Sequence, residues 1–387
     1  MSGGGDSIAL LHLLAEWARD GGPALHVVTV DHGLRAASAA EAAGVADLCH
    51  TLSLSHDILR WHDWEGPGNL MDAARRARLR MIAGWAKGRG IVTVALGHTA
   101  DDQAETFLMR LARGSGVDGL SAMAMQRQAL EVTWLRPLLA VRRDALRGYL
   151  RRRGATWIDD PTNDDPKFDR IKARQTLAAL EPLGITVDRI GSTVSLMSMA
   201  RTVLQGAVVQ LVQSSAREEA GSVVVDKPAL LAQPPETRLR FLAEAIRWVS
   251  SADYRPRLDA LTEAWAEVVS GQKRTLSGCI LHSDATRIRI ARELNAVAQA
   301  ASLTDQLWDN RWRVEGPHEA GLQVRALGAE GLRACPNWRE TGFSRDTLLA
   351  SPAIWRREAL IAAPLAGMSN GWTAEIPAGF SRFIVSH

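Results

Sequence analysis

Apolar segments and amphipathic segments alternate along the first part of the chain, through about residue 180. Runs rich in β-branched residues predict strands at 25–30 and 91–96, and the spacing of apolar positions predicts helices at 7–19 and 101–113. Gly114 is well placed to end the second of these helices. Strands that alternate with helices are typical of a parallel sheet covered by helices, so residues 1–180 are predicted to form an α/β domain.

The first predicted helix is preceded directly by a glycine-rich segment, Ser2-Gly3-Gly4-Gly5-Asp6-Ser7. Its glycines leave backbone N–H groups unobstructed at the positive end of a helix, which suits phosphate binding. A glycine run near a terminus is otherwise more often a flexible segment, so this feature needs support from other motifs. The segment does not have the Walker pattern G-x-x-x-x-G-K-S/T, so a phosphate loop here must be of another type.

Polar residues gather where the predicted strands end and the next helix begins. They are Asp31, His32, His98, Asp101, Asp102 and Glu105. In open α/β sheets ligands bind beyond the carboxyl ends of strands, so these side chains and the glycine-rich segment are expected to converge. Acidic residues in a first helical turn are commonly only caps, and a single histidine at a strand end is often structural. Together the acidic residues suit a metal ion or an ammonium group.

The Ser-Gly-Gly-x-Asp-Ser pattern resembles the pyrophosphate loop of the N-type ATP pyrophosphatases, the PP-loop superfamily. Three further stretches resemble one branch of it, the tRNA(Ile)-lysidine synthetase family. They are Val30-Asp-His-Gly-Leu-Arg35, the stretch from Gly97-His-Thr-Ala-Asp-Asp-Gln-Ala-Glu-Thr106 to Gly119, and Asp159-Asp-Pro-Thr-Asn163 with Phe168 and Arg170. The resemblance covers about residues 1–180 and implies an adenine nucleotide alpha-hydrolase-like fold.

The resemblance also implies a two-step ligation. ATP adenylates the oxygen on carbon 2 of the wobble cytidine in tRNA(Ile) with a CAU anticodon, and the amine of L-lysine then displaces AMP to give lysidine. Magnesium is expected as a cofactor, because the phosphate charge must be neutralised.

Site roles follow from the chemistry of the residues together with this resemblance. We expect ATP at Ser2, Gly3, Gly4, Gly5, Asp6, Ser7, Asp31 and His32; magnesium at Asp6 and Asp102; catalysis at Asp6, Asp102, His98, Arg75, Arg78 and Arg113; and lysine at Glu105 and Asp160. Each role has a structural alternative. The acids could only cap helices, Asp31 and His32 could only stabilise a loop, and Asp160 lies in a segment whose proline and asparagine already favour a turn.

Arginines concentrate between residues 136 and 153. The seven are Arg136, Arg142, Arg143, Arg147, Arg151, Arg152 and Arg153, opposed only by Asp144. Such a row could be a solvated helix face, but beside an ATP site it would also bind a tRNA backbone through counterion release. We therefore predict that Arg142, Arg143, Arg147, Arg151 and Arg152 contact tRNA.

The chain departs from the family pattern at two places. The family has a β-strand before the phosphate loop, whereas this sequence begins at Met1-Ser2, so we expect either an internal start of the reading frame or an absent central strand. Near Arg170 the family has Arg-Asn, and Ile171 stands in the second place here. Any function of that asparagine is therefore in doubt.

The rest of the chain differs in pattern from the first 180 residues. Helical spacing, with segments at 235–249 and 257–269, predicts a helical domain at 181–275 that binds tRNA or substrate. Residues 276–387 are predicted to form a small β-containing module, because Ile288 and Ile290 alternate with Arg287 and Arg289 and short strand-like pieces follow.

Composition narrows the alternatives. The net charge of +3 permits a nucleic-acid partner without requiring one. No apolar run reaches the length of a membrane span. A cytoplasmic location is the default expectation, because the first fifteen residues lack the basic start of a secretion signal. A homodimer is a separate expectation. The three cysteines include no Cys-x-x-Cys pair, which disfavours a related tRNA 2-thiocytidine thiolase with its iron–sulfur cluster. A catalytically inert RNA-binding relative is the remaining alternative.

Overall fold

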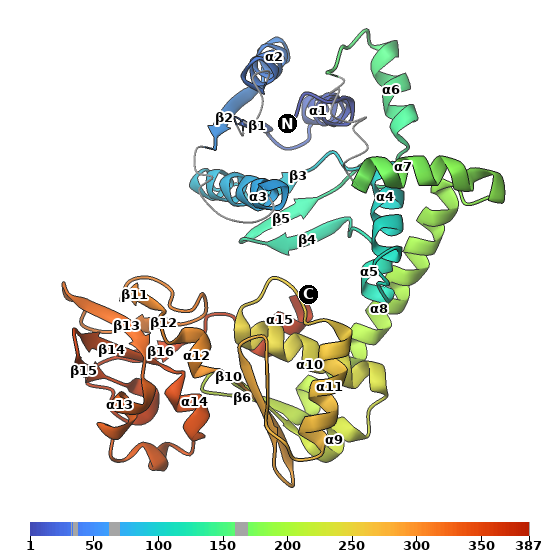
Figure 1. Ribbon diagram of the computed structural model, residues 1–387. Helices are drawn as coiled ribbons and strands as arrows, with labels where there is room; N and C mark the ends of the chain where they lie inside the picture. The colour runs from blue at the N-terminus through green and yellow to red at the C-terminus, as the bar shows by residue number, and fades with distance from the viewer. Residues whose placement is uncertain (32, 34–37, 62–69, 159–168, 387) are drawn as a thin grey trace. The chain divides into compact units, whose positions relative to one another are not determined.

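The computed structural model describes residues 1–31, 33, 38–61, 70–158 and 169–386. The chain forms two compact units, Met1–Arg201 and Thr202–His387 (Figure 1). His32 and Asp160, two of the predicted site residues, lie outside the described residues. In the part of the chain that the structure describes, no helix combines the length and apolar composition needed to cross a membrane.

The first unit alternates helices and strands as predicted. Its elements are α1 (Gly5–Arg19), β1 (His26–Asp31), α2 (Ser38–Thr51), β2 (Ser55–Arg60), α3 (Leu70–Gly88), β3 (Thr93–Ala95), α4 (Ala100–Leu111), α5 (Val117–Leu120), β4 (Gln126–Ala129), β5 (Val132–Leu135), α6 (Arg143–Arg152), α7 (Asp169–Leu180) and the first part of α8 (Val187–Ser215). The predicted strands at 25–30 and 91–96 and helices at 7–19 and 101–113 are therefore confirmed within a few residues. Gly114 follows α4 with a φ of 68°, as its proposed place at the helix end requires.

Parallel pairing is confirmed, but the described strands of this unit form two sheets where the sequence predicts one. β1 pairs in parallel with β2, and β3 pairs in parallel with β5, whose other edge carries the antiparallel β4. The carbonyl of Val28 in β1 accepts a hydrogen bond from the amino group of Met1. This part of β1 is thus bonded to the start of the chain and not to β3.

Apolar helix faces hold the elements that carry the predicted site. The buried face of α1, with Ile8 and Leu10, packs against Leu146 and Leu150 of α6. Helix α4 packs against α7, and Ala104 joins a cluster with the first turns of α8. Each fully buried leucine or isoleucine contributes roughly 1.5–3 kcal/mol. The N-termini of α1, α4 and α6 are therefore fixed by packing behind them.

The second unit begins within α8. Its further elements are β6 (Ala216–Glu219), β7 (Ser222–Asp226), α9 (Lys227–Leu231), α10 (Pro235–Ser250), α11 (Leu258–Val269), β8 (Arg274–Leu276), β9 (Cys279–Ser283), β10 (Arg287–Arg292), α12 (Leu294–Val297), β11 (Ala301–Leu303), β12 (Arg313–Glu315), β13 (Leu322–Ala326), α13 (Gly328–Arg333), α14 (Arg345–Leu349), β14 (Pro352–Arg356), β15 (Ala359–Ala362), β16 (Thr373–Glu375) and α15 (Phe380–Ser386).

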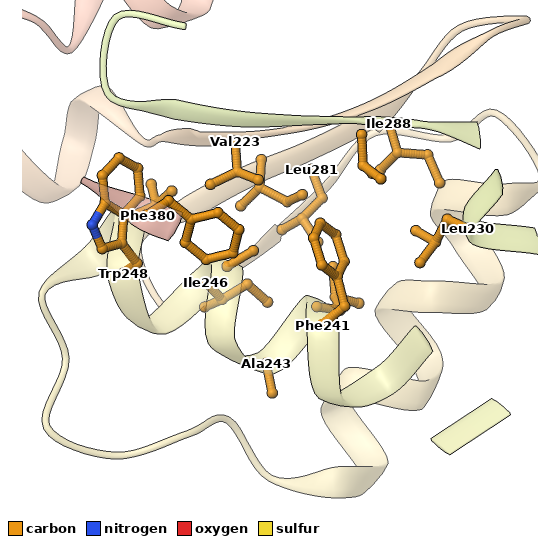
Figure 2. Close-up of a cluster of buried hydrophobic side chains, with 14 of the residues drawn as sticks. Val223, Leu230, Phe241, Ala243, Ile246, Trp248, Leu281, Ile288 and Phe380 are labelled. Carbon is orange, nitrogen blue, oxygen red and sulfur yellow. The ribbon is translucent and has the colours of Figure 1, made fainter. Parts of the chain in front are cut away.

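An antiparallel sheet in the order β6-β7-β10-β9-β8 packs against α10 and α11. Phe241 and Ile246 of α10 meet Leu281 and Ile288 of the sheet in a core that is closed by Phe380 (Figure 2). The predicted helices at 235–249 and 257–269 are confirmed, as is the alternation in β10. The region at 181–275 is not wholly helical, however, because β6 and β7 lie within it. The run Ser222-Val-Val-Val-Asp226 was the signal for β7, since β-branched residues favour strands.

Residues after β10 form short antiparallel strands around separate hydrophobic clusters. β11, β13, β14 and β15 form one sheet, and β12 pairs with β16. Trp308 and Trp372 are buried in one cluster, while Leu348 and Cys335 are buried in another. This region has the β-containing character that the sequence predicts. The division into three domains at about 180 and 275 stays a prediction, since the two compact units divide at residue 201.

Candidate active site

The glycine-rich segment forms the loop before α1 and the first residues of that helix. Gly3 has a φ of 72°, and a Cβ at this position would lie 2.8 Å from the Ile158 side chain, so only glycine fits without strain. The Gly3 carbonyl accepts a hydrogen bond from the Ile158 N–H at 3.0 Å, and the Ser2 and Ser7 hydroxyls lie 2.9 Å apart. The loop therefore has a defined shape that is fixed by its neighbours.

Gly4 is the N-cap of α1 and has no side chain to cap it. The N–H groups of a first helical turn have no acceptor within the helix, and here no capping side chain takes their place. They lie at the positive end of the helix dipole, where an anion is stabilised. The segment can therefore bind phosphate through its backbone.

The end of β3 lies against this loop. A Cβ at Gly97 would come within 3.2 Å of the Asp6 carbonyl oxygen and 3.3 Å of Ser7 Cα, so glycine permits a close backbone approach. His98 and the start of α4 follow directly. The structure thus brings together the loop, the His98 strand end and the acidic start of α4, as expected from their positions at strand ends.

Asp102 serves as a helix cap and also takes part in a charged cluster. Its Oδ2 accepts a hydrogen bond from the Thr99 N–H at 2.8 Å, and the Thr99 hydroxyl oxygen accepts one from the Asp102 N–H at 3.4 Å, which together form a capping box at the start of α4. Oδ2 also accepts a hydrogen bond from the Thr99 hydroxyl at 2.9 Å. Its Oδ1 lies 3.2 Å from the Arg143 guanidinium. The capping interpretation is therefore correct for one oxygen and leaves the other available for charge.

Three carboxylates meet on Arg143. Its Nε donates to Asp6 at 3.1 Å, its Nη2 to Asp102 at 3.2 Å and its Nη1 to Glu105 at 3.4 Å. We call Asp6, Asp102 and Glu105 the carboxylate cluster. Burial alone would lower the pKa of Arg143, but the three carboxylates raise it above its ordinary value. Burial raises the pKa of Asp6 despite the opposing effect of Arg143.

Two hydrogen bonds donated by backbone N–H groups connect the starts of α4 and α6. The Arg143 N–H donates to the Asp101 carboxylate at 2.7 Å, and the Ala100 N–H donates to the Val141 carbonyl at 2.9 Å. Asp101 therefore holds the backbone of Arg143 and does not face the guanidinium with the other acids. The sequence analysis gave the metal and catalytic roles to Asp102 and not to Asp101, and Asp102 is the one of the two that contacts the Arg143 guanidinium.

Glu105 is the most deeply buried member of the carboxylate cluster, with 1% of its surface exposed. Its Oε1 accepts hydrogen bonds from Arg143 and, at 3.1 Å, from Arg174 of α7. Its Oε2 is buried and has no hydrogen-bond partner among the described residues. Arg174 was missed by the sequence analysis, although its position one helical turn after Arg170 was a usable signal.

Three arginines, Arg78, Arg136 and Arg170, act electrostatically on His98. Burial, together with Arg136, Arg170 and Arg78, lowers the pKa of His98 to about 4, although Asp102 opposes this shift. His98 is therefore neutral at pH 7, and its buried Nδ1 has no partner among the described residues. The Arg78 Nε is likewise buried without a described partner, and burial lowers the Arg78 pKa. We call His98, Arg78, Arg136 and Arg170 the basic group.

The other predicted catalytic arginines lie in different settings. Arg75 is exposed on α3, and its charge contributes to lowering the pKa of Arg78. Arg113 follows α4 with 65% of its side chain exposed and forms an ion pair of 3.4 Å with Asp169. Asp31 uses its Oδ1 to accept hydrogen bonds from the Gly33 N–H and the Ser38 hydroxyl. These two bonds agree with the loop-stabilising alternative for Asp31.

The arginines of 136–153 do not form one surface. Arg143 is turned inward with 18% of its side chain exposed, and Arg142 lies 3.6 Å from both Asp101 and Asp188. Arg151 and Arg152 are exposed near the end of α6. Arg147 is half-buried, and its charge acts on Asp6. Of the five predicted tRNA contacts, Arg151 and Arg152 are the exposed ones, Arg142 and Arg147 are partly exposed, and Arg143 is turned inward.

The carboxylate cluster offers oxygen ligands for a divalent cation. The described residues hold no group of three or more His, Cys, Asp or Glu side chains that is arranged for a metal. Magnesium, however, is commonly held by one or two carboxylates and substrate phosphates. Asp6 and Asp102 approach the same guanidinium beside the phosphate loop, so these residues fit magnesium.

Comparison with known proteins agrees with this geometry. The family model for a PP-loop domain matches residues 1–181. The tRNA(Ile)-lysidine synthase of Ruegeria pomeroyi is 45% identical over 386 residues, which cover 100% of this chain and 92% of that protein. The chain belongs to the tRNA(Ile)-lysidine synthase family.

A second member of the tRNA(Ile)-lysidine synthase family, from Hyphomonas neptunium, is 37% identical over 304 residues, covering 76% of this chain and 80% of that protein. Among solved structures, the U34-tRNA thiolase NcsA from Methanococcus maripaludis with its 4Fe-4S cluster covers 51% of this chain and 71% of its own, at 18% identity and a TM-score of 0.44. The family-model match and the relatives in the tRNA(Ile)-lysidine synthase family place the glycine-rich segment in the PP-loop domain of a family of ATP-using ligases.

Proposed function

We propose that this protein ligates L-lysine to carbon 2 of the wobble cytidine of tRNA(Ile) with a CAU anticodon. The cytidine oxygen attacks the α-phosphorus of ATP and pyrophosphate leaves. The lysine amine then attacks carbon 2, a C–N bond forms, the C–O bond to AMP breaks, and the amine loses a proton. The observation that carries this proposal is the carboxylate cluster beside a phosphate-binding loop, in a member of the tRNA(Ile)-lysidine synthase family.

The loop and the basic group suit the charged parts of ATP. The N–H groups of the first turn of α1 have no side-chain cap and can bind an anion, and Arg78 supplies a buried guanidinium that has no described partner at its Nε. Magnesium at Asp6 and Asp102 would neutralise phosphate charge. The neutral His98 can accept or donate a hydrogen bond without adding charge.

Glu105 is suited to bind the ammonium group of lysine. Its Oε2 is a buried acceptor without a described partner, and a buried acceptor left unpaired costs roughly 1–3 kcal/mol. A cationic donor would satisfy this oxygen. Asp160 stays a second candidate for lysine, and His32 for ATP.

Arginines on the exposed part of α6 suit the tRNA backbone. Arg151 and Arg152 are exposed at the end of α6. The start of the same helix carries Arg143, which contacts the carboxylate cluster. A phosphate backbone bound at Arg151 and Arg152 would lie close to the site of ligation. A cytoplasmic location, where tRNA is found, and a homodimer are further parts of the proposal.

The cysteines give no support to sulfur insertion. Cys49, Cys279 and Cys335 are all buried and free, and they belong to separate hydrophobic clusters. Burial raises the pKa of each thiol, which disfavours the reactive thiolate.

The direct test is incorporation of labelled lysine. The full chain, ATP, magnesium and an unmodified tRNA(Ile) transcript should release AMP and pyrophosphate and label the tRNA at the wobble position. A transcript whose only change is uridine at that position is the matched control and should not be labelled. A folded protein that labels neither transcript would contradict the proposal.

A further inference from the structure

We propose that Arg143 is a positioning residue which holds the carboxylate cluster together before magnesium binds, and that the cation displaces its guanidinium from Asp6 and Asp102. This replaces the tRNA contact predicted from the sequence for Arg143. The inference rests on the proposed function, because it takes Asp6 and Asp102 to be the magnesium ligands.

The first argument is how the guanidinium is used. Its Nε, Nη1 and Nη2 each donate to a different carboxylate, from Asp6 of α1 and from Asp102 and Glu105 of α4. One positive charge shared by three carboxylates therefore reduces the repulsion that these acids would otherwise exert on one another at short range. Since 18% of the Arg143 side chain is exposed, it has little surface left for a phosphate backbone.

The second argument is competition for one oxygen. Asp102 Oδ2 already accepts two hydrogen bonds from Thr99, so Oδ1 is the oxygen that remains for a cation. Arg143 Nη2 lies 3.2 Å from this Oδ1. A metal ion would bind Oδ1 at about 2.0–2.1 Å. It would then repel the positively charged Arg143 Nη2, which lies 3.2 Å from the same oxygen. The guanidinium and the metal therefore occupy this position alternately.

The third argument is that the cluster stays neutralised when Arg143 leaves. Glu105 has a second cationic partner, because Arg174 Nη2 lies 3.0 Å from its Oε1. The Arg143 backbone remains fixed by the bond from its N–H to Asp101. Only the side chain of Arg143 has to move, while α4 and α6 keep their places.

The test measures binding of Mn²⁺, used as a probe for the magnesium site, to the full chain in the absence of tRNA. We expect R143Q to bind Mn²⁺ about tenfold more tightly than the wild type, because a competing cation is gone. R143K, with a single ammonium group, should lie between the two and serves if R143Q does not fold. Equal or weaker Mn²⁺ binding by R143Q and R143K, relative to the wild type, would overturn the inference.

A wrong magnesium assignment gives a different result from a wrong role for Arg143, and the proposed ligation is tested separately by lysine labelling. If D102N binds Mn²⁺ as well as the wild type does, the magnesium assignment itself is wrong and the inference fails with it. If D102N loses Mn²⁺ while R143Q and the wild type bind equally, the magnesium site stands and only the role of Arg143 is wrong.

The tRNA measurement separates a positioning role from a tRNA contact. R143Q should leave the slope of log affinity for tRNA against log salt unchanged, while the double variant R151Q/R152Q should reduce the slope by about 1–2. If R143Q reduces the slope by as much as R151Q/R152Q does, Arg143 contacts tRNA and the inference is overturned.

Discussion

The carboxylate cluster and the basic group lie in the same unit but treat charge in opposite ways. The acids of the cluster pair with Arg143 and Arg174 from within the protein, and Glu105 Oε2 is left without a partner among the described residues. In the basic group, Arg78 and His98 keep buried nitrogens that have no described partner. This difference supports the proposed exchange of the Arg143 guanidinium for a metal ion on the acidic side, whereas the basic side has polar atoms available for an anionic ligand. Substitutions in the carboxylate cluster and in the basic group should therefore affect different measured quantities.

The largest effect is expected from the carboxylate cluster. D102N should lower lysine incorporation by about a thousandfold, because it removes a charge at the proposed metal position while keeping the side-chain volume. Quantifying AMP release and labelled tRNA gives the result. D144N, in the exposed first turn of α6, is the matched control and should retain activity. Comparable loss in both variants would mean that the cluster has no special function.

A smaller effect, on a different quantity, is expected in the basic group. R78Q should weaken ATP binding by about ten- to a hundredfold, because a hydrogen bond to a charged group contributes roughly 1.5–3 kcal/mol. The measurement is ATP affinity in the absence of lysine and tRNA. R80Q, exposed on the same helix, is the control. Unchanged ATP affinity in R78Q would remove the distinction drawn between the two groups.

Replacing Glu105 tests whether this member of the cluster binds lysine and not ATP. E105Q should raise the KM for lysine by about tenfold and leave ATP affinity within about twofold, since the amide keeps one acceptor but loses the charge. Steady-state kinetics with varied lysine provide the comparison. E131Q, an exposed glutamate that pairs with Lys87, should behave as the wild type. A change in ATP affinity without a change in lysine KM would assign Glu105 to the nucleotide.

The smallest effect concerns stability and pH. The folded pKa of His98, about 4, lies below its ordinary value of 6.5. The unfolded chain therefore takes up a proton first as pH falls below 6.5, and the free energy of unfolding decreases between pH 6.5 and 4. H98N should remove this decrease. Urea unfolding at pH 7.5 and 5.5 should show a loss about 1 kcal/mol smaller in H98N than in the wild type, and equal losses would contradict the burial of neutral His98.

Local patterns predicted much of the first unit. Glycines before a helix, polar residues after β-branched runs and acids in the first turn of α4 are short-range signals, and the structure has the corresponding elements at those positions. The partners of the acids were not predictable in this way. Arg143 and Arg174 reach the cluster because α6 and α7 pack beside α1 and α4, which depends on tertiary contacts.

The row of arginines shows the same limit. In the sequence, Arg143 and Arg151 belong to one basic run, and neither charge nor spacing separates them. In the structure, the start of α6 faces the acids and its end faces solvent. In the second unit, β6 and β7 were missed because this short hairpin lies between the helices α8 and α9, although the valines of β7 favour a strand.

The joined starts of α4 and α6 have a consequence for how robust the site is. The first turns of α1, α4 and α6 carry Asp6, Asp102 and Arg143, so three helix dipoles end near one group of charges. Their field is a property of the backbone and survives side-chain replacements that leave the helix starts intact. A variant that loses one cation or one acid should therefore retain weak affinity for polyphosphate, and only disruption of a helix start would abolish that residual attraction.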